Sequence, residues 1–596
     1  MQFWSFFALV FALFSLIVIL FQRKDGQGRL RPRHLMRNTY LLLVSLLFYY
    51  KTSGWFVGLL ILVTCTDFII GKGIYHYRMK NLREGRTSIL PKLLLALSVT
   101  IDLGILCYFK YSYFFADMVN QLLGTNFEVT NIAAQAGNAL AGRPIWSIER
   151  IILPVGISFY TFQVISYTAD IYKGLIRPVR NILDFGFYVS FFPQLVAGPI
   201  VKASDFIPQL YKPYHLSRMQ FGMAVFWVLN GLAKKIILSD YLAVNFIDRV
   251  FANPLFFSGF ENLSALFVYS LQVYADFSGY TDIAIGLSLM MGFHLPQNFN
   301  SPYKAPNCQN FWKRWHISLS RWLQTYLYIP LGGNRNITLG TCFWVVVITL
   351  AALILSGSWT VSGIVLALFI FIIIYAWRRP DKRKLVYANT NSMITMLLGG
   401  LWHGASVNFM IWGGLNGLGM IIYKVWKETR LPLRIGIIAF NALLLIALIC
   451  MAPSPLWNVL LVILILVPLL TWCKPGSILL TFIFITFTRL FFRSGSNLDP
   501  AVANETAWNI ATQMISQIGS SWSVNPLEVI VAYKSVFILF AMGMLIHWLP
   551  ARLKRSYRIL FAKMPLPGML FVCFIAIFII YQFVTAEMQP FIYFQF

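Results

Sequence analysis

The chain has 596 residues, of which 58% are hydrophobic and only 12% are charged. Soluble domains carry about 25% charged residues, so this composition excludes a water-soluble globular fold. The formal net charge of +27 does not indicate nucleic-acid binding, because the cations lie in short loops between apolar runs, where they anchor the chain and contact lipid headgroups. The seven cysteines are scattered without a CxxC pair and predict neither a zinc site nor a disulfide framework.

Apolar runs of about 20 residues recur along nearly the whole chain, as membrane-spanning helices require. We count roughly 14 to 16 membrane-embedded segments and expect an all-α polytopic membrane protein. The first run, 3–21, is followed rather than preceded by basic residues, which indicates a retained span and not a signal peptide. The basic segment 22–38 is then expected in the cytoplasm and the N-terminus outside.

Charge also assigns sides to the other connecting segments. The segments 112–149 and 493–525 are poor in Lys and Arg, so they are expected to be outside loops. The last apolar run, 568–585, must leave the cytoplasm, which places the C-terminus outside. The resulting organisation is a membrane core over 1–492, an extracytoplasmic loop over 493–525, and a C-terminal hairpin over 526–596. The further cytoplasmic segments are 72–92, 169–181, 202–218, 300–322, 378–384, 424–434 and 551–563.

Some apolar runs are short or interrupted by Gly and Pro, among them 183–200, 280–296 and 393–406. Irregular backbone at membrane depth is tolerated only where it faces protein or a water-filled cavity. These runs therefore predict a central functional cavity. One broken element, FFPQLVAGPI, places Gln194 in an otherwise apolar frame.

The segment YADFSGYTDIAIGLSLMMGFHLPQNFN begins at residue 274 and carries two carboxylates in an apolar run. Asp276 and Asp282 would lie on different faces of a continuous helix. A break at Gly279 would let both line one cavity. The alternative is that each carboxylate caps or pairs with a neighbouring segment, and both interpretations stay open.

The segment FWKRWHISLSRWLQTYLYIPLGGNR spans 311–335. As a helix, it places its large apolar residues along one stripe and its basic residues elsewhere, which fits the membrane interface or a re-entrant path. His316 lies one turn from Trp312 and Ser320, so it has a defined neighbourhood. The alternative is an interfacial helix with one incidental histidine.

The segment MLLGGLWHGASVNFMIWGGLN spans 396–416 and places His403 in an apolar stretch. Ionisable groups inside a membrane are costly and usually mark a function. Desolvation keeps such an imidazole neutral, the form that a general base needs. Flanking glycines such as Gly400 and Gly404 are expected to leave room for a ligand. The alternative is a histidine that only hydrogen-bonds a neighbouring helix.

Four segments, in this order, resemble the signature of bacterial membrane-bound O-acyltransferases: FFPQLVAGPI, YADFSGYTDIAIGL, NFWKRWHISLSRW with YLYIPLGGNR, and LLGGLWHGAS. The similarity is greatest to the alginate O-acetyltransferase-like (AlgI-like) branch and covers about 1–492. It implies a ring of helices around a central funnel, with re-entrant or interfacial helices. In the family, a cytoplasmic thioester donor meets an acceptor from the other side, and the residues matching His316 and His403 are the catalytic candidates.

The resemblance implies an O-acyltransferase of the bacterial cytoplasmic (inner) membrane that moves acetyl toward an extracytoplasmic polysaccharide or cell-wall glycan. We expect His403 to be the general base and His316 to orient or polarise the donor. No metal and no tightly bound cofactor is expected. The expected acyl donor is acetyl-CoA. The expected partners are membrane lipids and an extracytoplasmic SGNH-hydrolase-like acyltransferase. The candidate substrate contacts are Gln194, Asp276, Ser278, Tyr280, Asp282, Trp312, Arg314, Trp402, Ser406 and Asn408.

The chain departs from the family pattern in two places. Gln324 and Thr325 replace the Arg-Asp pair that usually precedes YLYIPLGGNR, so any role of that ion pair is absent. Two further apolar runs, about 338–356 and 361–377, then precede a basic segment. We interpret residues 338–384 as an inserted helical hairpin that leaves the site assignments intact.

The chain ends in FIYFQF, which matches FxYxxF and is similar to the end of DltX, a small membrane protein that works beside the D-alanyl transferase DltB. That similarity implies that Tyr593 carries the acyl group. A thiol has a pKa near 8.5 and a phenol near 10, so transfer from a thioester to a phenol ester keeps the group activated. The alternative is an aromatic residue of the membrane interface.

Two other functions remain open at this point. The first is a DltB-like transferase that is fed by a carrier-protein thioester instead of CoA. The second is a transporter or flippase for an acylated lipid or glycan, since broken helices around a midplane cavity fit that class as well. Against transport, the chain has no repeated half and the two histidine segments would have no role.

Overall fold

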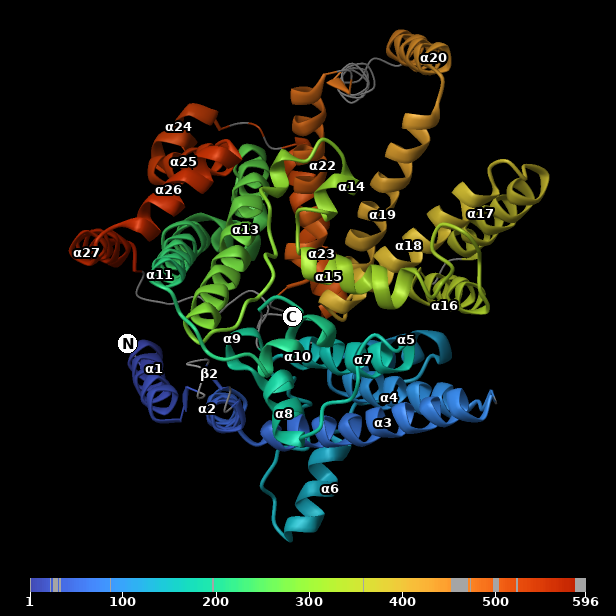
Figure 1. The fold of residues 1–596 in the computed structure, drawn as a ribbon. Coiled ribbons are helices and arrows are strands. Elements are labelled where there is room, and N and C mark those ends of the chain that lie inside the picture. The colour runs from blue at the N-terminus through green and yellow to red at the C-terminus, as the bar shows by residue number, and fades with distance from the viewer. Residues whose placement is uncertain are drawn as a thin grey trace.

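The computed structural model is almost entirely helical (Figure 1), which confirms the predicted all-α class. One antiparallel pair of two-residue strands, β1 (Arg23–Lys24) and β2 (Leu30–Arg31), connects the first two helices. The residues that the structure describes are 2–21, 23–24, 30–31, 34–85, 87–195, 198–356, 359–451, 470–471, 473–496, 503–520, 522 and 524–584.

The N-terminal helices pack around a first hydrophobic cluster, which includes Phe14, Leu60, Tyr160 and Phe185. These helices are drawn in blue and teal at the lower side of Figure 1, and α6 projects away from them. The elements are α1 (Gln2–Phe21), α2 (His34–Ser53), η1 (Gly54–Phe56), α3 (Val57–Glu84), α4 (Leu90–Leu106), η2 (Cys107–Tyr111), α5 (Ser112–Leu123), α6 (Ile132–Ala141), α7 (Ile157–Lys173), α8 (Ile182–Ser190), α9 (Phe192–Leu195) and α10 (Ala203–Leu210).

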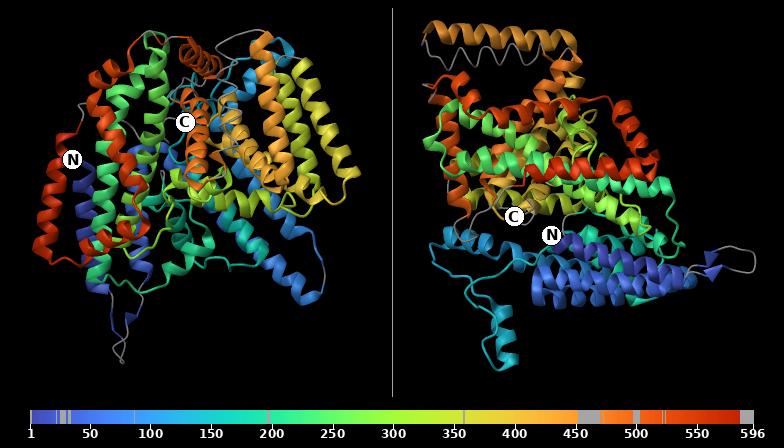
Figure 2. Two further views of the ribbon diagram at one scale, coloured as in Figure 1. Left: turned by 90° about the horizontal axis from the view of Figure 1, so that it is seen from above. Right: turned by 90° about the vertical axis from the view of Figure 1, so that its left-hand side faces the viewer.

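The remaining helices pack around a second hydrophobic cluster, which includes Tyr269, Trp315, Trp402 and Phe492. In the right view of Figure 2, the helices of this part lie above the N-terminal ones. Its first elements are α11 (Arg218–Ala233), η3 (Lys234–Asp240), η4 (Ala243–Ile247), α12 (Asp248–Ala252), η5 (Pro254–Phe256), α13 (Gly259–Met290), η6 (Pro302–Lys304), α14 (Cys308–Trp312), α15 (Ile317–Leu323) and η7 (Gln324–Tyr328).

The second half continues with a pair of apolar helices, α16 and α17, that pack against one another at the edge of the molecule. They occupy the region 338–384, where the sequence predicts a helical hairpin. The elements are α16 (Leu339–Ser356), α17 (Trp359–Arg378), α18 (Arg383–His403), α19 (Val407–Glu428), α20 (Leu431–Met451), α22 (Lys474–Ser494), α23 (Ala503–Ser520), α24 (Pro526–Ala532), α25 (Lys534–Trp548), α26 (Ala551–Lys563) and α27 (Leu566–Gln582).

The number of described helices that are long and apolar enough to cross a membrane is smaller than the roughly 14 to 16 embedded segments that the sequence predicts. Among the described residues, four helical stretches do, namely His34–Glu84, Leu90–Leu123, Arg218–Ala252 and Lys474–Ser494. The pair α24 and α25, bent by 89°, makes a fifth if it is one span. Shorter apolar helices in the described part of the chain include Leu339–Ile354, Gly363–Arg378 and Leu566–Gln582. The chain is a multi-pass integral membrane protein.

Of the alternatives considered for Gly279, the break does not occur, because helix α13 runs without interruption from Gly259 to Met290. The glycine allows a close helix contact instead. A Cβ on Gly279 would lie 2.8 Å from the carbonyl oxygen of Gly231 on α11, and a Cβ on Gly231 would lie 2.4 Å from that of Gly279. Small residues let helix backbones approach in this way.

Two predicted outside loops contain helices. Residues 112–149 include α5 and α6, and 493–525 includes α23, whose Ala507, Ala511 and Met514 are buried. Helix α23 packs against α13 and α22, so it is part of the body. Its apolar residues are too widely interspersed with polar ones for the sequence to indicate a span.

Candidate functional site

His316 lies at a break in the helical segment that the sequence predicts as one helix. Helix α14 ends at Trp312, α15 begins at Ile317, and His316 is the N-cap residue between them. Its backbone is left-handed, with φ 44° and ψ 54°, which is uncommon for a residue other than glycine. The side chain is fully buried within the protein. Strained backbone at such a place is often associated with a functional site.

The hydrogen bonds of His316 define its tautomer. Its Nδ1 lies 3.3 Å from Oδ1 of Asn298, and that oxygen also accepts the backbone N–H of Ser318 at 3.0 Å. Because a backbone N–H can only donate, the atom of Asn298 that faces it must be the oxygen. Nδ1 of His316 therefore donates to Asn298, and Nε2 of the neutral ring carries the lone pair.

His403 is the last residue of α18 and is 2% exposed. Its ring centre lies 5.0 Å from that of Trp402, 5.1 Å from Trp412 and 5.4 Å from Phe492. These aromatic side chains come from α18, α19 and α22 and surround the imidazole with apolar surface. Proton transfer at His403 would thus take place in a frame from which bulk water is excluded.

The structure brings the two predicted catalytic histidines together. The ring centres of His316 and His403 are 6.3 Å apart, which is too far for a direct hydrogen bond between the rings. Trp402 lies beside both, with its ring centre 6.1 Å from that of His316. Two imidazoles at this spacing are near enough to act on the same reacting group.

The glycines around His403 serve helix packing and not ligand access, which corrects the sequence expectation. A Cβ on Gly400 would lie 2.2 Å from the carbonyl oxygen of Phe409, and one on Gly404 would lie 2.0 Å from the Phe409 ring. Helix α19 therefore fills the space beside these glycines. They hold α18 and α19 in close contact next to His403.

An open pocket of about 660 Å³ lies between the segment 309–334 and helices α18 and α19. Three lysines line it, Lys313, Lys424 and Lys427. They belong to the segments 300–322 and 424–434, which the sequence predicts to be cytoplasmic. Trp312 also lines the pocket, and its ring lies 5.6 Å from Trp412, which contacts His403. Two tryptophans thus separate a cationic pocket from the histidine pair.

Asp276 and Asp282 are engaged in ion pairs with the α11–η3 segment. Lys235 Nζ lies 2.6 Å from Asp276 and 2.8 Å from Asp240. Lys234 Nζ lies 2.6 Å from Asp282, which also accepts a hydrogen bond from an asparagine on α11. Of the two interpretations of these carboxylates, pairing with a neighbouring segment is the one that the structure supports.

Three of the other candidate contacts hydrogen-bond neighbouring segments of the protein. Asn408 donates to Ser494 and to the Ala507 carbonyl, and Gln194 donates to the Tyr188 carbonyl, so these amides join neighbouring segments. Arg314 donates to Asn310 and to a backbone carbonyl outside the histidine pair. Trp402 and Trp312 lie nearer to the two histidines than these polar residues do.

The remaining candidate contacts are two serines and a tyrosine. Ser278 and Ser406 are buried, and no described residue hydrogen-bonds their hydroxyl groups. Tyr280 is half-buried.

Thr325, one of the two departures from the family pattern, has a polar contact of its own. Its hydroxyl accepts a hydrogen bond from Lys202 Nζ at 2.8 Å, and its carbonyl accepts one from Lys173 Nζ at 3.2 Å. Cations therefore remain at this position although the Arg-Asp pair is absent. Tyr593 lies outside the described residues.

Sequence patterns did not single out Arg489, a buried cation on α22 that is 2% exposed. Its guanidinium carbon lies 4.2 Å from the centre of the Trp315 ring, and its Nε and Nη1 have no hydrogen-bond partner among the described residues. Its helix α22 also carries Phe492, whose ring centre lies 5.4 Å from that of His403. Its only sequence signal is an arginine within an apolar run, which is costly in a membrane.

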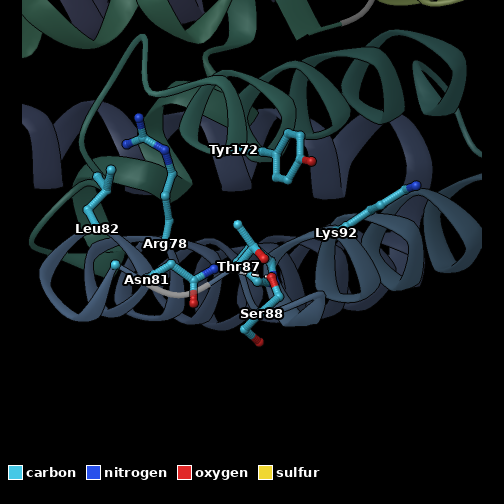
Figure 3. A pocket seen from close by; sticks show the side chains of 9 residues that line it. Arg78, Asn81, Leu82, Thr87, Ser88, Lys92 and Tyr172 are labelled. Atoms are coloured by element: carbon cyan, nitrogen blue, oxygen red, sulfur yellow. Dashed lines mark hydrogen bonds between the residues drawn. The ribbon is translucent and has the colours of Figure 1, made fainter.

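A second pocket, of about 570 Å³, lies at the turn between α3 and α4. Figure 3 shows Arg78, Lys92 and Tyr172 among its lining side chains. None of the lining residues is a predicted site residue. The Arg78 guanidinium also packs over Gly174, where a Cβ would lie 2.1 Å from Nη2, so this arginine helps to hold the end of α7 against α3.

Comparison with known proteins agrees with the motifs. The family model described as the membrane-bound O-acyltransferase family matches residues 172–355. The chain is 35% identical over 415 residues to the Pseudomonas putida protein named "Probable alginate O-acetylase AlgI", and the alignment covers 69% of this chain and 70% of that relative. The chain belongs to the membrane-bound O-acyltransferase family.

Other relatives of this membrane-bound O-acyltransferase have different named acceptors. It is 32% identical over 417 residues to the Helicobacter pylori "Peptidoglycan O-acetyltransferase", covering 65% of each chain. It is 24% identical over 287 residues to the Bacillus subtilis "Teichoic acid D-alanyltransferase", covering 47% of this chain and 61% of the relative. The alignment with the Pseudomonas aeruginosa AlgI relative, 35% identical, spans 66% of this chain and 62% of that protein.

Proposed function

We propose that this chain is an O-acyltransferase that moves an acetyl group from a cytoplasmic thioester to an extracytoplasmic polysaccharide, in a bacterial cytoplasmic membrane. Both chain termini are proposed to lie outside. The observation that carries the proposal is the His316–His403 pair, with ring centres 6.3 Å apart inside an aromatic frame. Buried ionisable side chains in a membrane protein are costly and usually mark a function.

In the proposed reaction, His403 accepts the proton of an acceptor hydroxyl while the hydroxyl oxygen forms a bond to the thioester carbonyl carbon. The tetrahedral intermediate collapses, the carbon–sulfur bond breaks, and the leaving thiolate takes the proton from His403. The products are an O-acetyl ester and a free thiol. His316 orients the donor; because its Nδ1–H is committed to Asn298, it would polarise the carbonyl only after protonation at Nε2.

The proposed donor is acetyl-CoA, and the lysine-lined pocket of about 660 Å³ supports it. Lysine ammonium groups bind phosphate oxygens as point charges, and CoA carries several phosphates. A carrier-protein thioester is the alternative donor, since its phosphopantetheine arm also bears a phosphate. The similarity to a protein named teichoic acid D-alanyltransferase is the reason for considering that alternative.

Tyr593 is proposed to carry the acetyl group between the histidine pair and an extracytoplasmic SGNH-hydrolase-like partner. A phenol ester lies between a thioester and a sugar ester in the quality of its leaving group, so each transfer runs downhill. If Tyr593→Phe supports full acetylation of the polysaccharide, then this relay is wrong, while transfer by the histidine pair stays possible.

The function is tested with purified protein and acetyl-CoA labelled in the acetyl group. Wild-type protein should release free CoA thiol and transfer the label to a hydroxyl acceptor, and His403→Ala should abolish both. His76→Ala is the matched control, because this histidine is exposed. Full activity of His403→Ala would refute the assignment. Activity that appears only with an acylated carrier protein would favour the alternative donor.

A further inference from the structure

The end of α18 that bears His403 has no backbone cap among the described residues. Gly404, which follows it, is extended, with φ −165° and ψ 157°. Many helices end instead in a left-handed residue whose N–H returns to the last turn, as α3 does at Gly85. The last carbonyl groups of a helix need partners from elsewhere when such a cap is absent.

Side chains of a distant helix supply these partners. The hydroxyl of Tyr111 donates to the carbonyl oxygen of Leu401 at 2.7 Å. Nζ of Lys110 donates to the carbonyl oxygen of Trp402 at 2.6 Å and to that of His403 itself at 3.1 Å. The last three residues of α18 thus have their carbonyl groups bound by two neighbouring side chains.

Lys110 and Tyr111 lie in the π-helical segment η2, between α4 and α5. A π-helical turn contains an extra residue, which changes the direction of the side chains in it, and such turns are frequent at functional sites. Among the described carboxylates none forms an ion pair with Lys110. Its ammonium group faces the negative end of the α18 dipole, where a cation is favoured, and lies 5.9 Å from the centre of the Trp402 ring.

We propose that Lys110 and Tyr111 are positioning residues that fix the last turn of α18 and thereby hold the His403 imidazole beside His316. This inference rests on the proposed function of His403 and deepens it. The terminal residue of a helix moves most when the last turn frays. A displacement of about 1 Å in a reacting group can lower a rate by about 100-fold, so a cap at this point controls catalysis more than it controls folding.

The rest of α18 is held independently of this cap. Gly400 and Gly413 pack the backbones of α18 and α19 together, with a Cβ on Gly413 lying only 2.3 Å from the Met396 carbonyl oxygen. Asn391, nearer the start of α18, donates to the Gly333 carbonyl at 2.9 Å. Loss of the Lys110 and Tyr111 hydrogen bonds should therefore loosen the last turn and leave the helix in place.

The test compares Lys110→Met, Tyr111→Phe and Lys110→Arg with Lys92→Met. Lys92 is the control because it is exposed and lies on α4, the helix that precedes η2. Amide hydrogen exchange is measured on the peptide that covers residues 396–406. Exchange should accelerate in Lys110→Met, and to a lesser degree in Tyr111→Phe, while Lys92→Met matches the wild type. Because exchange needs no turnover, it tests the cap even if the proposed function is wrong.

Kinetics then test whether the cap matters for transfer. Lys110→Met should lower kcat by about 10- to 100-fold with KM for the donor unchanged, and Lys110→Arg should recover most of that loss. Unchanged exchange and kcat in Lys110→Met would overturn the inference. So would a loss of kcat that only parallels loss of folded protein and is not recovered by arginine. An active His403→Ala variant would instead refute the proposed function, whatever Lys110→Met does.

Discussion

The His316 ring donates from Nδ1 to Oδ1 of Asn298, which is held in place because the same oxygen accepts the backbone N–H of Ser318. Asn298 thus determines the tautomer of a histidine whose backbone is left-handed. The other histidine of the pair, His403, is the last residue of α18. The two imidazoles are therefore oriented by independent parts of the chain.

Replacing Asn298 by Leu should lower activity more than stability. Without the amide oxygen, His316 loses the acceptor of its Nδ1–H, and its tautomer and ring orientation are no longer fixed. We expect kcat to fall about 10-fold or more, as misorientation of a reacting group predicts. Steady-state kinetics with labelled acetyl-CoA measure it, and Asn310→Leu on α14 is the control. A kcat equal to that of the control would contradict the role of Asn298.

The Lys234–Asp282 pair should behave as a buried ion pair. Removing one partner leaves an uncompensated charge and should destabilise the protein by about 3–5 kcal/mol, so Asp282→Leu alone should lower the midpoint of thermal unfolding in detergent strongly. The double variant Lys234→Met with Asp282→Leu should recover much of that loss. If the single and double variants are equally unstable, the pair does not act as a coupled unit.

Lys424 and Lys427 should contribute to donor binding and not to chemistry. Both line the pocket beside Trp312, so their replacement by Ala should raise KM for acetyl-CoA several-fold while kcat stays close to wild type. Added salt should raise KM in the wild type and have less effect in the double variant, because exposed charges are screened. Lys80→Ala, an exposed lysine on α3, is the control. A fall in kcat without a change in KM would argue against this pocket as the donor site.

Arg489→Met tests whether the buried guanidinium affects stability or acetyl transfer. Replacement of a buried charge by an apolar side chain of similar size is often neutral or stabilising, so the unfolding midpoint should not fall by more than a few degrees. Acetyl transfer should fall at least 10-fold if the guanidinium contributes charge at the site. Wild-type activity in a well-folded Arg489→Met would show that the cation is dispensable.

Lys554 on α26 should make stability rise in the alkaline range. Burial and then the nearby Lys304 and Lys234 ammonium groups lower its pKa from 10.5 to about 8. Between about pH 8 and pH 10.5 the unfolded chain binds more protons at this group than the folded protein, so its contribution to the free energy of unfolding increases with pH. Lys554→Met should remove that increase. An unchanged pH dependence of thermal unfolding in the variant would contradict the shift.

The sequence predicted which segments form the site but not how they are held. The motifs around His316 and His403 identified two histidines that the structure places together. The break at His316 was not predicted; Asn298, which lies outside the His316 segment, hydrogen-bonds Ile317 and Ser318 directly after it. Lys110 and Arg489 were missed for a similar reason, since their roles depend on helix ends and rings brought close only by the fold. The sequence left open whether Gly279 breaks its helix, because a close helix contact and a helix break both favour glycine.

The histidine pair is proposed to pass an acetyl group from one side of the membrane to the other. Inside-out vesicles that contain the protein and enclose a hydroxyl acceptor receive labelled acetyl-CoA on the outside only. We expect label on the enclosed acceptor with wild-type protein and none with His403→Ala, while thiol release falls in parallel. Equal enclosed label in wild type and His403→Ala, or label confined to the donor side, would contradict the account.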